Sequence, residues 1–328
     1  MTHQGPVVVT VTPNPSIDRT IALGGPLTRG AVHRVQSVSD EPGGKGVNVA
    51  RVLTLAGIDA CAVLPASPDD PFLSVLSPTG VGYAAVPVTG VVRTNVAVTE
   101  NDGTTTKLNE PGAGLDAASV TALTDAVLTR AAGAQWVVMS GSLPPGMPEN
   151  WYAEVAALLR ELPCKVAVDT SEGPLAALAA DFERAAPNLI KPNSEELASL
   201  SGADPEQLER AVQHGDPEAV VAAATELMNR GVGAVLATLG AAGAVLVNGT
   251  GAWMAAAPPI TPRSTVGAGD SSLAGYVRAA IGGAEEPRRL QMAVAYGSAA
   301  AALPGSALPS PQLIDLDAVQ VVPIAPDR

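Results

Sequence analysis

The chain has 328 residues, of which 47% are hydrophobic and only 3% aromatic, and a formal net charge of −13. A core of small aliphatic side chains favours layered helices and strands over a β-sandwich. The strong negative charge makes nucleic acid an unlikely partner, and no stretch approaches 18 consecutive apolar residues, so a membrane partner is not expected either.

Short runs rich in valine and alanine alternate with helical patterns along most of the chain. This alternation predicts a doubly wound α/β fold with a mostly parallel sheet covered by helices. The expected strands are 7–13, 61–66, 136–142, 165–171, 188–193, 234–240 and 243–249. The expected helices are 46–56, 115–132, 149–161, 194–201, 217–230, 268–282 and 287–302. The proline-rich segment from residue 304 onward is expected to be irregular.

Two stretches interrupt this alternation. Residues 17–42 and 88–111 alternate apolar and polar side chains, and Asp102-Gly103 is typical of a hairpin turn. They predict a small antiparallel sheet added to the main layers. Its apolar face needs a cover, which the active site, a second copy of the chain, or both could supply. No linker or repeat marks a second domain, so we expect residues 1–328 to form one domain.

The two cysteines, Cys61 and Cys164, lie far apart, each within an apolar stretch. This placement predicts buried, reduced thiols and therefore a cytoplasmic location. The first residues, MTHQGPVVVT, carry neither the basic segment nor the long apolar run of an export signal, which agrees with that location.

The segment TVGAGD places small residues before an acidic one, where a helix is expected to begin. The amides of Gly267, Ala268 and Gly269 would converge at the helix N-terminus and stabilise developing negative charge. Asp270, beside them, could take a proton from an attacking hydroxyl. The alternative is a tight turn followed by an acidic residue that only stabilises the first helical turn.

In the segment PGGKGVN, Gly43, Gly44 and Gly46 surround Lys45, and Asn48 follows on the first turn of an expected helix. Glycines let the backbone approach a ligand closely, and the lysine places positive charge at a helix N-terminus, so an anionic or polyhydroxylated ligand is expected. The segment is not a Walker phosphate loop, because glycine follows the lysine. The dinucleotide-binding fingerprint is absent as well.

Other polar residues follow expected strands, at the sheet edge where open α/β proteins bind ligands. Asp18 could accept hydrogen bonds from a sugar diol or could simply form a turn. Ser140, in SGSLPPG, lies at the same edge. Asn193 and Glu196, in KPNSEEL, could hold a hydrated Mg²⁺ or could instead cap a helix.

Positive charge is scarce, since the chain has only four lysines. A protein this acidic that binds phosphate must concentrate positive charge locally, and Lys45, Arg93 and Lys107 are the candidates. Arg93 and Lys107 could also be ordinary exposed residues of a hairpin. The sequence has no HExxH, CxxC or GxSxG pattern that would indicate another chemistry.

Taken in order, TPNPSID, PGGKGVNVARVL, SGSLPPG, KPNSEEL and STVGAGDS resemble the ribokinase-like carbohydrate kinases of the PfkB family, in particular its phosphosugar branch. Each motif is short, but the ordered set spans residues 12–271. The resemblance implies a three-layer α/β/α kinase whose small sheet acts as a lid and often joins two subunits, so a homodimer through that sheet is expected.

The resemblance also implies a role for each motif. Asp270 would deprotonate the acceptor hydroxyl while Gly267, Ala268 and Gly269 stabilise the transferring phosphoryl group. Residues expected to hold the sugar phosphate are Asp18, Gly43, Gly44, Lys45, Asn48, Arg93 and Lys107, with Ser140 a looser match. Residues expected on the ATP and Mg²⁺ side are Lys191, Asn193, Glu196, Thr238, Gly240, Gly243 and Ser298. The family's usual GT near its C-terminal helix is replaced here by LPGSALPS.

The implied reaction is Mg²⁺-dependent phosphorylation of a sugar phosphate by ATP. The segments RTNVAVTENDGTTTKLNEPG and GGKGVN favour fructose 1-phosphate as the substrate and fructose 1,6-bisphosphate as the product. Tagatose 6-phosphate and fructose 6-phosphate stay open as substrates, and a phosphosugar sensor without catalysis is a further alternative.

Overall fold

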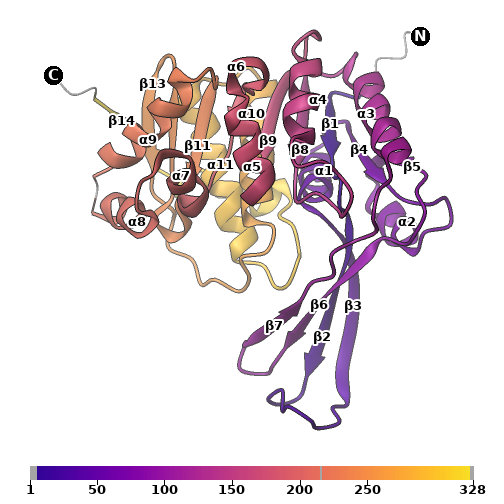
Figure 1. Cartoon of the computed structure of the whole chain (residues 1–328). Helices are drawn as coiled ribbons and strands as arrows, with labels where there is room; N and C mark the ends of the chain where they lie inside the picture. Colours follow the sequence, from indigo (N-terminus) through magenta and orange to yellow (C-terminus); the bar gives the residue numbers. More distant parts are fainter. Residues whose placement is uncertain (1–5, 215, 326–328) are drawn as a thin grey trace.

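A computed structural model describes residues 6–214 and 216–325 (Figure 1). The beginning of the MTHQGPVVVT segment and both ends of the expected domain lie outside the described residues. A ten-stranded sheet forms the centre, in the order β14-β13-β12-β11-β10-β9-β8-β1-β4-β5. Its strands are β1 (Val8–Val11), β4 (Ala60–Pro65), β5 (Gly82–Val86), β8 (Trp136–Ser140), β9 (Lys165–Asp169), β10 (Leu189–Ile190), β11 (Ala234–Thr238), β12 (Ala244–Asn248), β13 (Gly251–Ala255) and β14 (Val321–Ile324).

The strands from β5 to β11 are parallel to their neighbours, whereas β12, β13 and β14 are antiparallel. Central strands such as β1, with the sequence VVTV, are buried on both faces, which is why they appear as continuous apolar runs. The parallel arrangement brings the carboxyl ends of seven strands to one edge, where most of the motifs lie.

Helices cover both faces of this sheet and enclose two hydrophobic cores. One layer consists of α3 (Ala117–Ala131), α4 (Trp151–Leu159), α5 (Glu172–Ala180), α6 (Phe182–Ala185), α7 (Ser194–Ser201), α8 (Pro205–Gln213) and α9 (Glu218–Asn229). The other consists of α1 (Lys45–Leu55), α2 (Pro71–Leu76), α10 (Ala268–Ile281) and α11 (Glu286–Ala301). The predicted three-layer α/β/α architecture is therefore confirmed. None of the helices in the described ranges is long and apolar enough to cross a bilayer.

The prediction of an irregular segment from residue 304 onward was wrong in part. Residues Val321–Ile324 form β14, which pairs with β13 and extends the sheet. Pro323 lies in this strand. A proline is tolerated there because β14 is an edge strand, on which not every backbone amide needs a partner.

A second sheet of four strands projects from the main body (Figure 1). Its order is β3-β2-β6-β7, with β2 (Ser16–Leu23), β3 (Val35–Gly43), β6 (Arg93–Thr99) and β7 (Thr105–Leu108). The outer pairs are antiparallel as predicted, but the central pair β2 and β6 is parallel. Both central strands run away from the main body, because each is the first strand of a hairpin. The second strand of each hairpin, β3 or β7, runs back toward the main body.

The two faces of this small sheet differ. Asp18 lies opposite Asn95 in the register of β2 and β6, on a polar face. On the other face Ile21 lies opposite Val38. Val38 and Leu108 are 52% and 61% exposed, whereas Ile17 on the same face is buried, so part of this face remains open on the single chain.

Candidate active site

The GGKGVN and GAGD motifs meet at the carboxyl edge of the large sheet. Helices α1 and α10 start there and pack against each other. Asn48, on the first turn of α1, donates a hydrogen bond through its side-chain amide to Asp270 Oδ2 at 2.8 Å. Two segments 222 positions apart are thereby joined by one buried hydrogen bond.

The start of α10 has the geometry of an anion site. Gly267 is its N-cap and has a left-handed φ of 75°. The first-turn amides that follow have no partners within the helix and carry the positive end of its dipole. The Ala268 amide donates a long hydrogen bond of 3.4 Å to the Thr265 carbonyl, just before the helix. A β-carbon on Gly269 would lie 3.2 Å from Lys191 Nζ, so the ammonium group of Lys191 also lies at this helix start.

Asp169, which the sequence analysis missed, links the two lysines of the site. It is the last residue of β9 and is only 1% exposed. Its Oδ1 lies 3.1 Å from Lys45 Nζ and its Oδ2 lies 3.3 Å from Lys191 Nζ. The rule that singled out Asp18, a carboxylate where a strand ends, would also have found Asp169.

Burial and charge set the protonation of this cluster. Burial first, and then the negative charge of Asp169, raise the pKa of Asp270 to about 6. Burial opposes the ionisation of Asp169, but Lys191 and Lys45 outweigh it and hold its pKa below the ordinary range. Asp169 in turn raises the pKa of Lys45. Asp270 is therefore ionised at pH 7 and more basic than an exposed aspartate, as a general base should be.

On the small sheet, Asp18 is held by its neighbours. Ser16 donates a hydrogen bond to Asp18 Oδ1 at 2.7 Å, and the Asn95 amide donates to the same oxygen at 3.2 Å. The backbone of Gly43 packs directly against the Asp18 carboxylate, where a β-carbon would clash. Gly44 has a φ of 109°, and a β-carbon there would lie 2.6 Å from Thr12 Cγ2. Both glycines are thus required by close packing within the protein itself.

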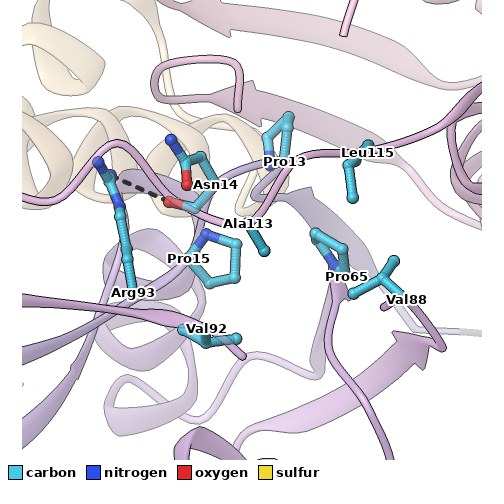
Figure 2. Close-up of a pocket in the computed structure, with 9 residues that line it drawn as sticks. All are labelled: Pro13, Asn14, Pro15, Pro65, Val88, Val92, Arg93, Ala113 and Leu115. Carbon is cyan, nitrogen blue, oxygen red and sulfur yellow. Dashed lines mark hydrogen bonds between the residues drawn. The ribbon is translucent and has the colours of Figure 1, made fainter. Parts of the chain in front are cut away.

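Arg93, the first residue of β6, is half-buried beside the end of β1. Its Nη1 donates to the Glu110 carbonyl at 2.9 Å and its Nη2 donates to the Asn14 carbonyl at 3.1 Å (Figure 2). Burial lowers the pKa of the guanidinium. Its Nε is buried and has no hydrogen-bond partner among the described residues.

Two further residues predicted for the sugar phosphate are Ser140, which ends β8 opposite Asp169 in the register of β8 and β9, and Lys107 on the small sheet. Lys107 is exposed on the outer strand β7, opposite Ala97. Ser140 is fully buried, and its hydroxyl has no hydrogen-bond partner among the described residues. Two residues further on, Ser142 accepts a hydrogen bond from the Asn14 amide at 3.4 Å. Ser142 and Asn14 are further residues of this edge that sequence reasoning missed.

Asn193 and Glu196 form a capping box at the start of α7. Asn193 Oδ1 accepts from the Glu196 amide at 2.8 Å, and Glu196 Oε2 accepts from the Asn193 amide at 2.9 Å. Glu196 therefore does cap the helix, as the alternative interpretation predicted, but its Oε1 takes no part in the capping box. Burial, and then Asp169, raise the pKa of Glu196. Thr238 lies beside this segment, its amide donating to the Pro192 carbonyl at 2.9 Å.

The residues around Glu196 fit a hydrated magnesium ion. Among the described residues, no three His, Cys, Asp or Glu side chains are grouped as a ready-made metal site. Mg²⁺ bound with a nucleotide needs only one or two protein carboxylates, the remaining ligands being phosphate and water. Glu196 Oε1 could supply such a ligand.

The other residues predicted for the nucleotide lie on two segments. Gly240 has a left-handed φ of 55° and open space where a β-carbon would stand, whereas Gly243 packs against the Ala255 carbonyl. Ser298 is half-buried on α11. Its neighbour Gly297 lies close to the Ala268 carbonyl at the start of α10, with 3.3 Å between that oxygen and a β-carbon built on the glycine. Their contact with a nucleotide stays a prediction.

Comparison with known proteins defines the class to which this fold and site belong. Residues 11–313 match the model of the pfkB family carbohydrate kinases, and the chain belongs to this family. It is 38% identical to a 1-phosphofructokinase of Rhodobacter capsulatus over 314 residues, which cover 93% of both chains.

Solved structures agree with this assignment. The chain superposes on phosphofructokinase-2 from Escherichia coli, in a complex with potassium, with a TM-score of 0.84 and 29% identity, covering 94% of this chain and 96% of the other. Ribokinase of Arabidopsis thaliana, in a complex with ribose and ATP, shares the fold with a TM-score of 0.71 at 19% identity, covering 96% of this chain and 97% of the other.

Proposed function

We propose that this carbohydrate kinase transfers a phosphoryl group from ATP to fructose 1-phosphate and so forms fructose 1,6-bisphosphate. The observation that supports the proposal most is the arrangement of Asp270. It is a buried carboxylate of raised pKa, bonded to Asn48, at a helix start beside Lys191. The relatives named 1-phosphofructokinase favour this substrate.

In this mechanism Asp270 takes the proton from the acceptor hydroxyl as its oxygen attacks the terminal phosphorus of ATP. The new P–O bond forms while the bond to ADP breaks, and ADP leaves with the electron pair. Charge on the transferring group would be met by the amides of Gly267, Ala268 and Gly269 and by Lys191. Mg²⁺, held in part by Glu196, would neutralise phosphate charge during the transfer. Asn193, Thr238, Gly240, Gly243 and Ser298 would border the nucleotide.

Asp18, Lys45 and Asn48 would hold the sugar, and Arg93 its existing phosphate. Lys107 is exposed on the outer strand, on the same face of the small sheet as Asp18, and would approach that phosphate if the small sheet closed over the main body. Closure of this sheet as a lid would exclude water, the competing phosphoryl acceptor. The lid would consist of residues 17–42 and 88–111, inserted in a single kinase domain that functions in the cytoplasm.

The exposed apolar face of the small sheet supports a homodimer. Ile21 and Val38 lie on this face, and Val38 and Leu108 are more than half exposed. Exposed apolar side chains on a sheet commonly mark an interaction surface. A related structure, phosphofructokinase-2 of Escherichia coli, is described in a tetrameric inhibited form.

The test is ADP formation by the purified protein with ATP, Mg²⁺ and one acceptor at a time. Fructose 1-phosphate, fructose 6-phosphate, tagatose 6-phosphate and fructose are compared. We expect kcat/KM for fructose 1-phosphate to exceed the others at least tenfold, since only the correct phosphate position pairs with the half-buried guanidinium of Arg93. A preference for either 6-phosphate would replace the proposed substrate. Binding of phosphosugars without ADP formation would indicate a sensor and refute the kinase.

A further inference from the structure

Asn14 is a buried amide between two prolines. It follows β1 in the segment TPNPS and is 6% exposed. The rings of Pro13 and Pro15 restrict the backbone on both sides, so the residue has little freedom to turn. A buried amide is costly unless its hydrogen-bonding groups find partners, which makes its contacts informative.

These contacts join three separate segments of the chain. The Asn14 side-chain amide donates to the Pro111 carbonyl at 3.1 Å and, at a longer 3.4 Å, to Ser142 Oγ. Gly112, with a φ of 98°, packs against Asn14 Oδ1 so closely that only glycine fits. Asn14 therefore fixes the loop that returns from the small sheet against the end of β1 and the loop after β8.

The same residue determines where the guanidinium of Arg93 lies. The carbonyl of Asn14 accepts from Arg93 Nη2, and the carbonyl of Glu110 accepts from Nη1. The second acceptor lies next to Pro111, the residue to which the Asn14 amide donates. Both acceptors of Arg93 thus depend on Asn14, one directly and the other through the loop that it holds.

Both of these acceptors are neutral carbonyls. In the described part of the chain Arg93 makes no ion pair, and its buried Nε has no partner. A guanidinium held by carbonyl groups keeps its full charge for an incoming anion, whereas a carboxylate partner would compete with that anion. The arrangement orients the cation through neutral groups, while the carboxylates of Asp18 and Glu110 act on it from beyond ion-pair distance and raise its pKa against the effect of burial.

The hollow that Arg93 borders is small. It measures about 10 Å³ and lies among Pro13, Pro15, Pro65, Val88 and Val92, which is room for one water molecule at most (Figure 2). A phosphate group does not fit there, so in this proposal it approaches Arg93 from the side of the sugar site.

We infer that Asn14 is a positioning residue for phosphate recognition: it orients Arg93 toward the existing phosphate of the sugar and so sets the affinity for phosphorylated over unphosphorylated sugar. The inference rests on the proposed function, because it assigns the phosphate to Arg93. Asn14 itself touches neither the nucleotide nor the reacting hydroxyl in this account.

The test measures kcat, the KM for both substrates and the Kd for the sugar phosphate in Asn14→Ala and Asn14→Asp. Losing one or two buried hydrogen bonds should raise the KM and Kd for fructose 1-phosphate roughly 5- to 30-fold. The KM for ATP and kcat should stay within threefold of wild type. Asn14→Asp keeps the shape of the side chain but loses both donated hydrogen bonds, so its KM and Kd for fructose 1-phosphate should rise at least as much. This second variant keeps the test decisive if Asn14→Ala folds poorly.

Ser67→Ala is the matched control. Ser67 Oγ donates to the Val88 carbonyl at 2.7 Å and, at a longer 3.5 Å, to the Gly90 carbonyl, and Val88 borders the same hollow. Ser67→Ala thus also loosens a loop that leads into the small sheet, but it should change the KM for fructose 1-phosphate less than twofold. An equal effect in Ser67→Ala would show that general loosening of the loops, and not orientation of Arg93, is responsible.

A double-mutant cycle separates this inference from the proposed function. In the background of Arg93→Ala, the further change Asn14→Ala should alter the Kd for fructose 1-phosphate less than twofold, because the group that it orients is gone. Additive losses, or wild-type affinity in both Asn14 variants, would overturn the inference alone. Wild-type affinity in Arg93→Ala would instead refute the phosphate site itself.

Discussion

Two regions of the molecule differ in how firmly their polar groups are held. One is the corner where α1 meets α10, and the other is the small sheet. In the corner, Asp169 and Asp270 are 1% and 6% exposed, and each is bonded to groups from other segments. On the small sheet Lys107 is exposed, and so are Val38 and Leu108 on the opposite face. In the proposed function the chemistry therefore belongs to the buried corner, whereas recognition and assembly depend on the sheet that projects from it.

The largest expected effect comes from the corner. Asp270→Asn keeps the shape of the side chain but removes its basicity, so kcat should fall roughly 10²- to 10⁴-fold. The Kd values for both substrates, measured by calorimetry, should stay within a few fold of wild type. Near-normal turnover would show that the buried carboxylate has only a structural role and that the chemistry does not take place in the corner between α1 and α10.

A smaller effect is expected where the small sheet begins. Arg93→Ala should raise the KM for fructose 1-phosphate roughly 10- to 100-fold, because a charge-assisted contact to phosphate is lost, while kcat changes little. Lys107→Ala is the matched control from the outer strand and should raise the same KM less than threefold. A larger effect of Lys107 would mean that the sheet closes further during binding than its position here suggests.

The face of the small sheet away from the site should affect assembly and not chemistry. Val38→Asp places a charge on the exposed apolar face and should weaken a homodimer at least tenfold, as judged by sedimentation velocity at several concentrations. Ser39→Asp, the next residue on the same strand, points to the other face and should leave the dimer intact. If both variants sediment as wild type does, the apolar face is not the dimer contact.

The sequence predicted the parts of this molecule that repeat a simple pattern. Most of the buried strands and seven of the helices were found because their periodicity is local. Strands β5 and β13 and helices α2, α5, α6 and α8 were not predicted. Strand β14 was missed because its proline and short length hide an edge strand. The motifs around Asp270, Lys45 and Asn48 were recognised, but nothing local shows that Asn48 and Asp270 share a hydrogen bond.

The residues that were missed share a physical reason. Asp169 ends a strand in an apolar run and Asn14 lies between prolines, so each resembles an ordinary strand end or turn. Their importance comes from partners more than 90 positions away, namely Lys45 for Asp169 and Pro111 for Asn14. Such contacts depend on tertiary packing, which local pattern does not specify.

The central claim is that the ionised form of Asp270 activates the acceptor, and the pH dependence of kcat/KM tests it most directly. Activity should be lost as the pH falls through the pKa of Asp270, about 6. The monoester of a sugar phosphate also titrates near pH 6, so the profile must be repeated in Asp169→Asn. This change removes a negative charge that raises the pKa of Asp270 and should move the acid limb to lower pH, whereas ionisation of the substrate stays where it was. If the pH profile of kcat/KM has no acid limb, or if this limb does not move in Asp169→Asn, the role of Asp270 as the base is contradicted.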